Sequence, residues 1–231
     1  MKKTAVIIAA IAVAGVASAA VYNDAVGDVF TGIPAILDLV SVEIQNDATD
    51  IQFTLNLVGD PTTATGTDWG KYLVAIDSVA GGSTTNNGWN RPISMSSGMD
   101  YWVGTWVDGG GGAETHSWDG LAWNRDNATW DPPSDVSLTS ITTSSVTFET
   151  TLASLGLSVG DTFVFDVFTS GGNDWDGALD ALSDASTIGD WGTAYDSTST
   201  LQYTVVPEPA TLGLLGMAGL GMFLFRKQLK I

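Results

Sequence analysis

The middle of the chain alternates between apolar and polar residues with a period of two, the pattern of a β-strand that buries one face. Residues 38–45 and residues 50–58 both show this alternation, and the polar segment 46–49 separates them. Two such runs joined by a short polar loop predict a β-hairpin. Further strands are predicted at residues 71–78, 100–107, 114–118, 121–125, 136–142, 145–152, 162–169 and 200–206.

The number and spacing of these strands predict the fold. Asp119-Gly120 suits a two-residue hairpin turn, and residues 177–184 are expected to form one short helical turn. About nine or ten strands with turns between them, and no internal repeat, predict an all-β fold. The expected architecture is a single antiparallel β-sandwich over residues 21–205, in which the first and last strands hold the ends of the domain and Pro207 marks where it stops.

The N-terminal segment has the three parts of a secretory signal peptide. Lys2-Lys3 precede an apolar run from Thr4 to Val16, and the small residues Ala17-Ser18-Ala19 follow as a cleavage site. The run is too short for an ordinary membrane span and ends in small residues, so residues 1–20 are predicted to be removed by signal peptidase after export through the general secretion machinery. Lysines before this segment belong on the cytoplasmic side, so the following domain is placed outside the cytoplasm.

The C-terminal segment also has three parts in a fixed order. They are Val206-Pro207-Glu208-Pro209, the uncharged apolar run 210–225, and the basic residues Arg226, Lys227 and Lys230. The two prolines restrict their own φ angles and favour extended residues before them. The apolar run of 16 residues would span about 24 Å as a helix, which is short for a bilayer but usable if the membrane thins and the basic side chains snorkel. A transmembrane helix is therefore predicted at 210–225.

This tail resembles the PEP-CTERM sorting signal of exported bacterial proteins. The resemblance implies recognition by an exosortase-type membrane protease, cleavage near Pro207-Glu208-Pro209, and release of the domain to the cell surface or extracellular matrix. The basic residues are fewer than the arginine run usual in that signal. The alternative is an ordinary single-span C-terminal anchor.

Charge narrows the classes of partner. Three bases, Lys71, Arg91 and Arg125, and 25 acids lie between the two targeting segments, so the exported domain has a net charge of −22. Nucleic acids and anionic lipids need a basic surface, so neither is expected as a partner. The charge instead favours solubility, cation binding, or a place in an acidic matrix. The chain has no cysteine, so its core must be stable without disulfides.

Candidate catalytic residues are few. His116 is the only histidine, it lies beside the glycines of 109–112, and no Gly-x-Ser-x-Gly motif is present. An exposed loop histidine is the expected interpretation, and one histidine without cysteine cannot supply the usual zinc ligands. Glycoside hydrolysis needs two positioned carboxylates. The domain has three glutamates, and two of them, Glu43 and Glu149, fall on the polar phase of their strands.

Calcium is the candidate cofactor. Asp174, Asp176 and Asp180 place carboxylates at short intervals in one loop, and hard cations prefer such oxygen ligands. The spacing is not that of an EF-hand, since the position of the bidentate glutamate is an alanine. The alternative is a polar loop whose aspartates cap turns. A second candidate group near the start of the domain consists of Asp24, Asp28 and Asp38.

Tryptophan is concentrated in one part of the chain, with seven of nine between residues 69 and 130. Alternation in 101–107 puts Trp102, Gly104 and Trp106 on one face of a strand. If the other face is core, two indoles stand about 13 Å apart on the open face, where flat aromatic rings suit stacking on sugars. A glycan-binding patch is therefore predicted at Trp102 and Trp106, with Trp118 or Trp123. Alternatively, both faces are covered, or the indoles fill the space over glycine.

The order of the strands, with an Asp-rich segment before a paired second and third strand, resembles carbohydrate-binding module family nine and its DOMON-like relatives. Two functions follow as hypotheses. The first is a noncatalytic surface or matrix protein, either with or without weak binding to extracellular polysaccharide. The alternative is a secreted carbohydrate-active enzyme or its accessory domain. Exposure of the two strand tryptophans, and a cleft with paired carboxylates, would distinguish them.

Overall fold

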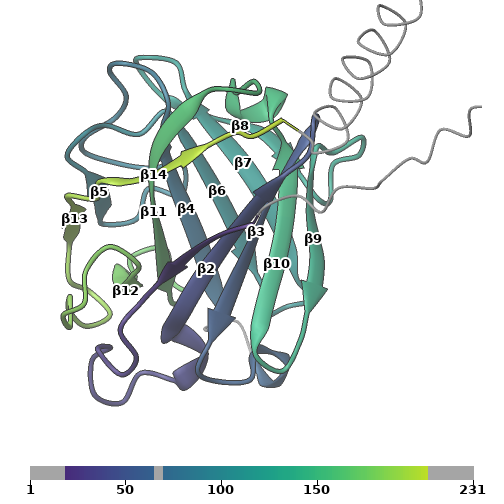
Figure 1. Cartoon of the computed structure of the whole chain (residues 1–231). Coiled ribbons are helices and arrows are strands. Elements are labelled where there is room, and N and C mark those ends of the chain that lie inside the picture. Colours follow the sequence, from purple (N-terminus) through teal and green to yellow (C-terminus); the bar gives the residue numbers. More distant parts are fainter. Residues whose placement is uncertain (1–18, 65–69, 208–231) are drawn as a thin grey trace, which may run out of the picture.

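The structure is a computed structural model that describes residues 19–64 and 70–207, and its two large β-sheets pack face to face (Figure 1). The first sheet has the strand order β1 (Ala20–Asn23), β2 (Leu39–Asn46), β3 (Asp50–Leu57), β10 (Ser145–Thr151) and β9 (Val136–Ile141). The second has the order β12 (Ala178–Ala181), β11 (Thr162–Ser170), β4 (Lys71–Asp77), β6 (Tyr101–Trp106), β7 (Gly112–Trp118) and β8 (Trp123–Ala128), and β14 (Leu201–Thr204) also pairs with β11. All pairs within these two sheets are antiparallel.

The main core lies between the two sheets and follows from the alternation in the sequence. In β3, Ile51, Phe53 and Leu55 are fully buried while the residues between them are partly exposed. Phe53 stacks on Phe148 of β10 with ring centroids 5.5 Å apart. Each large apolar side chain buried in this way stabilises the fold by about 1.5–3 kcal/mol. The predicted all-β antiparallel sandwich is confirmed.

Most predicted strands lie within a residue or two of their expected positions. The β2–β3 hairpin forms, and the Asp47 carboxylate accepts hydrogen bonds from the Thr49 and Asp50 amides in its turn. The β7–β8 hairpin forms as well. Its turn contains Gly120 at φ +95°, and the Asp119 carboxylate accepts from the amides of the next residues. The short polar side chains that punctuate the sequence therefore act through local hydrogen bonds to the backbone.

The predicted helical turn at residues 177–184 is wrong, because this segment contains the strand β12. Its pairing with β11 satisfies backbone groups that an isolated helical turn would leave unpaired. The other strands that were not predicted are the short β1, β5 (Ile93–Met95) and β13 (Tyr195–Ser197), and β5 and β13 form a small parallel pair. The described residues therefore hold fourteen strands, where nine or ten were expected.

A second apolar cluster covers the outer face of the second sheet. Leu73, Trp102 and Phe168 point to this side and pack with Met95 and Met99 from the long connection between β4 and β6. That connection lies over the sheet, so β4 is buried on both of its faces. Its near-continuous apolar sequence, YLVAI, fits a strand that is covered on both sides.

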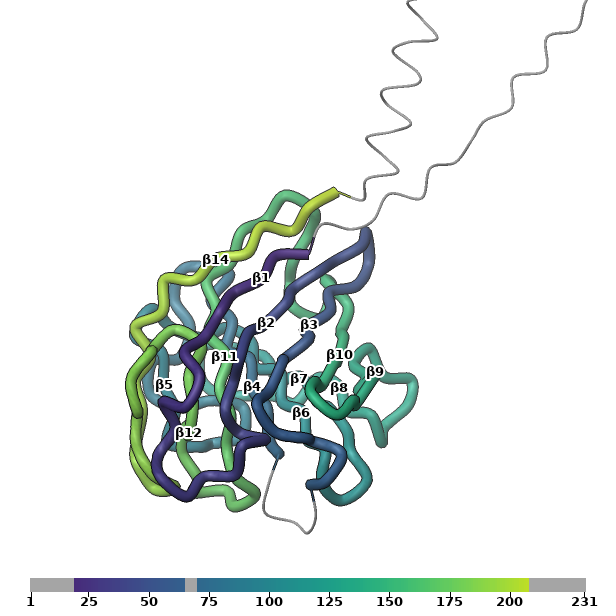
Figure 2. Tube along the Cα trace, turned by 60° about the horizontal axis from the view of Figure 1, so that its bottom comes forward, coloured from purple at the N-terminus to yellow at the C-terminus, as the bar shows by residue number. Residues whose placement is uncertain are grey.

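The ends of the domain lie together and are hydrogen-bonded. The Tyr22 hydroxyl donates to the Gln202 carbonyl, and Asn46 both donates to the Val206 carbonyl and accepts from its amide. Figure 2 shows β1 and β14 side by side, with both ends of the described chain leaving the sandwich at the same end. The ends of the described domain are therefore held together through β1, which was not predicted, and through Asn46 at the end of β2, the first strand that was predicted.

The predicted signal peptide at residues 1–20 falls almost entirely outside the described residues, and the predicted transmembrane helix at 210–225 does so completely. Within 19–64 and 70–207, no helix is long and apolar enough to cross a membrane.

Candidate functional site

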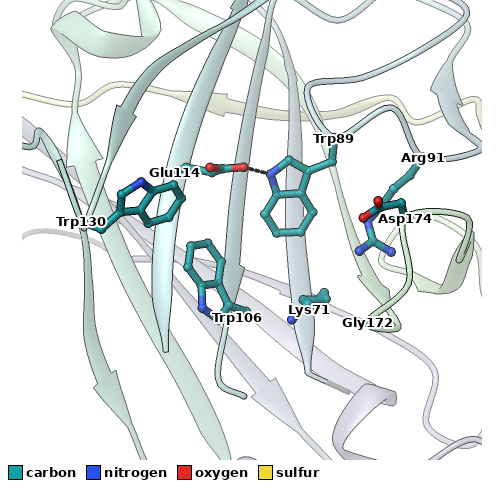
Figure 3. Close-up of a pocket in the computed structure, with 8 residues that line it drawn as sticks. All are labelled: Lys71, Trp89, Arg91, Trp106, Glu114, Trp130, Gly172 and Asp174. Carbon is teal, nitrogen blue, oxygen red and sulfur yellow. Dashed lines mark hydrogen bonds between the residues drawn. The ribbon is translucent and has the colours of Figure 1, made fainter. Parts of the chain in front are cut away.

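An open pocket of about 400 Å³ lies on the outer face of the second sheet, beside the covered part of that face. It is lined by Lys71, Trp89, Arg91, Trp106, Glu114, Trp130, Gly172 and Asp174 (Figure 3). The strands β4, β6 and β7 form its floor, the connection between β4 and β5 forms one wall, and the loop between β11 and β12 forms another. Elements far apart in the sequence therefore build one concave surface.

Three tryptophans form the aromatic part of the pocket. Trp106 lies between the other two, with its ring centroid 6.2 Å from that of Trp89 and 5.4 Å from that of Trp130. The planes are tilted by 50° and 49°, so the rings form a curved surface rather than a flat stack.

Two glycines make room for these rings. A Cβ atom at Gly104 would come within 2.2 Å of the Trp89 ring, and one at Gly112 within 2.3 Å of the Trp106 ring. Because Gly104 and Gly112 lie on neighbouring strands, they open adjacent spaces on the sheet. Any larger residue at either position would displace an indole.

The polar groups of the pocket are held in place by one another. Glu114 pairs with Gly104 across the ladder and accepts hydrogen bonds from the Trp89 indole N–H and from the His116 side chain. Arg91 donates to the Ser170 hydroxyl at 2.7 Å and lies 5.3 Å from the Trp89 ring centroid. The hydrogen bond from the indole to Glu114 therefore fixes the orientation of the Trp89 ring relative to the sheet. The Arg91 guanidinium contacts the same ring through a cation–π interaction.

All three basic residues of the domain lie at or beside the pocket. Lys71 and Arg91 line it, and Lys71 donates to Asp108. Arg125 is placed over the Trp130 ring, 5.3 Å from its centroid. Asp174 faces the same pocket, where its negative charge favours the charged form of the Arg91 guanidinium. The pocket therefore offers aromatic faces, carboxylates and cations together, while the rest of the domain is strongly acidic.

The structure divides the four predicted glycan-binding tryptophans. Trp106 lines the pocket, but Trp102 is fully buried and stacks on Phe168, so its predicted exposure is wrong. Trp102 and Trp106 do lie on the same face of β6, as predicted, but the connection between β4 and β6 covers that face at Trp102. Trp118 and Trp123 form a separate pair, with ring centroids 5.8 Å apart, near the β7–β8 turn.

Sequence reasoning missed Trp89 and Trp130 as pocket residues, since neither lies in a predicted strand. The abundance of tryptophan in this part of the chain was the available signal. His116 was expected in an exposed loop, but it lies in β7, is 8% exposed, and contacts Glu114. That expectation is wrong because β7 begins at Gly112 and the connection carrying Gly88 packs directly on the imidazole.

The predicted calcium ligands do not gather as expected. Asp176 accepts hydrogen bonds from the Asn173 amide and side chain, and Asp174 faces the aromatic pocket. Asp180 lies apart from both, in β12, where it accepts from the Leu39 amide. Of the second candidate group, Asp38 accepts from the Gly27 amide.

Asp24 and Asp28 instead join Asp180 in one cluster, where ligand oxygens from all three lie within 4.8 Å of one another. Burial, with a smaller contribution from the neighbouring carboxylates, raises the pKa of Asp24 to about 7 and that of Asp180 to about 8. Burial likewise raises the pKa of Asp28. The cluster thus combines one residue from the predicted calcium loop with two from the second candidate group.

The fold and these sites define the described part of the chain as a β-sandwich domain with an aromatic pocket. The C-terminal residues 205–228 match the PEP-CTERM protein-sorting motif. This is the motif of an exported protein that is sorted to the cell surface and processed by an exosortase, a membrane protease. Val206 and Pro207 lie at the end of the described domain, whereas Glu208, Pro209, Arg226, Lys227 and Lys230 fall outside the described residues.

A search of curated proteins and a search of solved structures each found no match. The resemblance of the middle domain to carbohydrate-binding module family nine and DOMON-like proteins therefore stays a prediction.

Proposed function

We propose that the chain is a noncatalytic surface or extracellular-matrix protein that binds extracellular polysaccharide in the aromatic pocket after exosortase cleaves its tail. The single observation that carries the proposal is the grouping of Trp89, Trp106 and Trp130 around one open pocket with Glu114 and Asp174 beside them. Sugars present apolar C–H faces and hydroxyl rims, and these match aromatic faces and carboxylates respectively. An exported, sorted protein meets such polymers outside the cell.

The size and openness of the pocket suit a short stretch of polymer. A volume of about 400 Å³ falls at the low end of the range for small-ligand sites, about 300–1,000 Å³. Trp130 is 52% exposed, so its ring is available to a chain that lies along the surface. The held orientation of Trp89 reduces the conformational entropy lost on binding.

The test is a titration of the full chain, in a non-ionic detergent, with neutral and acidic polysaccharides, followed by tryptophan fluorescence. Trp130→Ala is expected to weaken binding. Trp118→Ala is the matched control, since it removes an indole from the other pair on the same sheet and is expected to leave binding unchanged. Unchanged emission of the unmodified protein with every polysaccharide would overturn the proposal, as would equal binding by Trp130→Ala.

The cleavage part of the proposal has its own test. Mass spectrometry of the protein recovered from the cell surface is expected to show a chain that begins near Ala20 and ends near Pro207. Recovery of the full-length chain from the surface would indicate the simple anchor instead. Recovery of the full-length chain from the cytosol would overturn export altogether.

The enzymatic alternative is favoured by one observation: two carboxylates, Glu114 and Asp174, line the same pocket. Hydrolysis of a glycosidic bond needs such a pair. Incubation with each bound polysaccharide and analysis of its chain length distinguishes the two functions. Shortening that disappears in Glu114→Gln would establish the enzyme, and unchanged chain length with binding intact would support the binding protein.

A further inference from the structure

The cluster of Asp24, Asp28 and Asp180 lies at the edge strand of the second sheet and shares no residue with the aromatic pocket. Asp24 and Asp28 belong to the loop that follows β1, and Asp180 belongs to the edge strand β12 of the other sheet. Asp180 is 2% exposed, and its two oxygens accept from the backbone amides of Leu39 and Ala181. The cluster therefore joins the N-terminal loop to the second sheet.

Three of the six carboxylate oxygens of this cluster have no hydrogen-bond partner in the described part of the chain. Within residues 19–64 and 70–207, Asp24 Oδ2 and both carboxylate oxygens of Asp28 are buried below 1 Å² of exposed area and are unpaired. The other three atoms in this condition, on Arg91, Trp102 and Thr150, are scattered through the domain. A buried carboxylate without a partner is costly, so three such oxygens in one place indicate a missing ligand.

No basic side chain of the domain serves as that ligand. Lys71 pairs with Asp108, Arg91 donates to Ser170, and Arg125 lies over Trp130, all at the aromatic pocket. The other charges that act on the cluster are the acids Asp38, Asp166 and Asp184. The cluster is thus a concentration of negative charge that no cation of the described domain balances.

We propose that Asp24, Asp28 and Asp180 bind a Ca²⁺ ion that fastens the loop after β1 to β12. The donor set consists of carboxylate oxygens alone, which suits a hard cation and is unlike the nitrogen and sulfur ligands typical of zinc. Calcium accepts six to eight oxygens in a flexible geometry, so water completes its shell. The site goes beyond glycan binding, since it lies on other residues and serves the stability of the fold.

Calcium binding can be tested on the full chain in a non-ionic detergent after removal of metal with EDTA. Calorimetric titration with CaCl₂ is expected to show one site, and the Tm is expected to rise. An equal rise with MgCl₂ would overturn the assignment to calcium. The absence of any change in Tm with millimolar CaCl₂ would overturn the site.

Variants locate the ion. Asp28→Asn keeps the shape of the side chain but removes the charge, and it is expected to weaken calcium binding at least tenfold. Because the Asp28 oxygens have no protein partner, the same variant is expected to have an equal or higher Tm in EDTA. A lower Tm in EDTA together with unchanged calcium binding would show a structural role and overturn the proposal.

Two matched controls complete the test. Asp174→Asn changes the loop that the sequence favoured, and Asp131→Asn removes a charge from an exposed aspartate elsewhere. Both are expected to bind calcium as the unmodified protein does. Loss of binding in Asp174→Asn but not in Asp28→Asn would place the ion in the loop and overturn the proposal. Asp24→Asn serves as a second variant of the cluster if Asp28→Asn does not fold.

Discussion

The aromatic pocket and the acidic cluster are built in opposite ways, although one segment contributes to both. Gly172 and Asp174 precede β12 and line the pocket, and Asp180 within β12 belongs to the cluster. At the pocket, Glu114 is hydrogen-bonded and cations lie nearby. At the cluster, three buried oxygens are unpaired and every charged neighbour is negative.

The difference shows how a domain with 25 acids and three bases distributes its few cations. All three bases are used at the pocket, where they fix indole rings or pair with an acid. The cluster is left without any of them. The pocket is therefore preorganised by the protein alone, whereas the cluster depends on a cation from outside.

The largest expected effect is a loss of stability when the buried apolar cluster on the outer face of the second sheet is disrupted. Trp102→Ala removes a fully buried indole that stacks on Phe168, and it should lower the free energy of unfolding by about 3–5 kcal/mol. Urea unfolding in saturating CaCl₂ measures this loss. Trp118→Ala, which truncates a half-buried ring, should cost clearly less. An equal loss for both variants would mean that Trp102 is not the buried support described above.

The second effect is a dependence of stability on pH that comes mainly from the buried carboxylates in and near the acidic cluster. Burial raises the pKa of Asp166 to about 6, that of Asp24 to about 7 and that of Asp180 to about 8, from 3.8. Because the folded state then binds protons more tightly than the unfolded state, the free energy of unfolding should fall as pH rises from about 4 to about 8. Asp47 and Asp119 have lowered pKa values, so they change stability only below about pH 4.

In EDTA, we therefore expect the protein to be more stable at pH 5.5 than at pH 8, by on the order of 2 kcal/mol. Calcium holds the carboxylates of the cluster ionised, so saturating CaCl₂ should reduce or reverse this difference. Urea unfolding at the two pH values, with and without calcium, gives the four numbers needed. Higher stability at pH 8 in EDTA would contradict both the buried acids and the contrast with the pocket.

The third effect should be confined to the pocket. Trp130→Ala removes an exposed ring that contacts Trp106 and Arg125, and it should weaken polysaccharide binding about five- to tenfold, or about 1–1.4 kcal/mol. Calcium affinity should stay unchanged, because the cluster shares no residue with the pocket. Affinity electrophoresis and calorimetry measure the two constants. A parallel loss of calcium binding would show that the two regions are not independent.

The smallest effect is expected for Glu114→Gln. The amide oxygen of glutamine can still accept from the Trp89 indole, so the ring should keep its orientation and binding should change by about two- to threefold at most. Glu114→Ala is the contrasting variant, because it leaves the Trp89 N–H without its acceptor. Fluorescence titration of both variants separates positioning of Trp89 from direct contact with the sugar. Equal loss in both variants would favour direct contact by the charge.

The sequence predicted the strands well where apolar and polar residues alternate along the chain. Residues 50–58 carry large apolar side chains at every second position, and β3 buries them as expected. The prediction failed at residues 177–184, whose apolar spacing also suits a helical turn. Pairing with β11 decided that segment, and pairing partners are remote in sequence. The same reason hid the pocket, since Trp89 and Trp130 lie in connections whose paths depend on packing.

The amino-acid sequence by itself determined the C-terminal sorting motif, the acidic charge, and which residues of each strand share a face, because these depend only on the local sequence, the composition and the period of two. Only the tertiary structure decided what covers each face. Trp102 and Trp106 share one face of β6, yet one is buried by a connection and the other lines a pocket. Likewise, Asp24 and Asp180 come together only because the packing of the two sheets brings the loop after β1 against the edge strand β12. No local sequence pattern predicts a contact between residues so far apart in the chain.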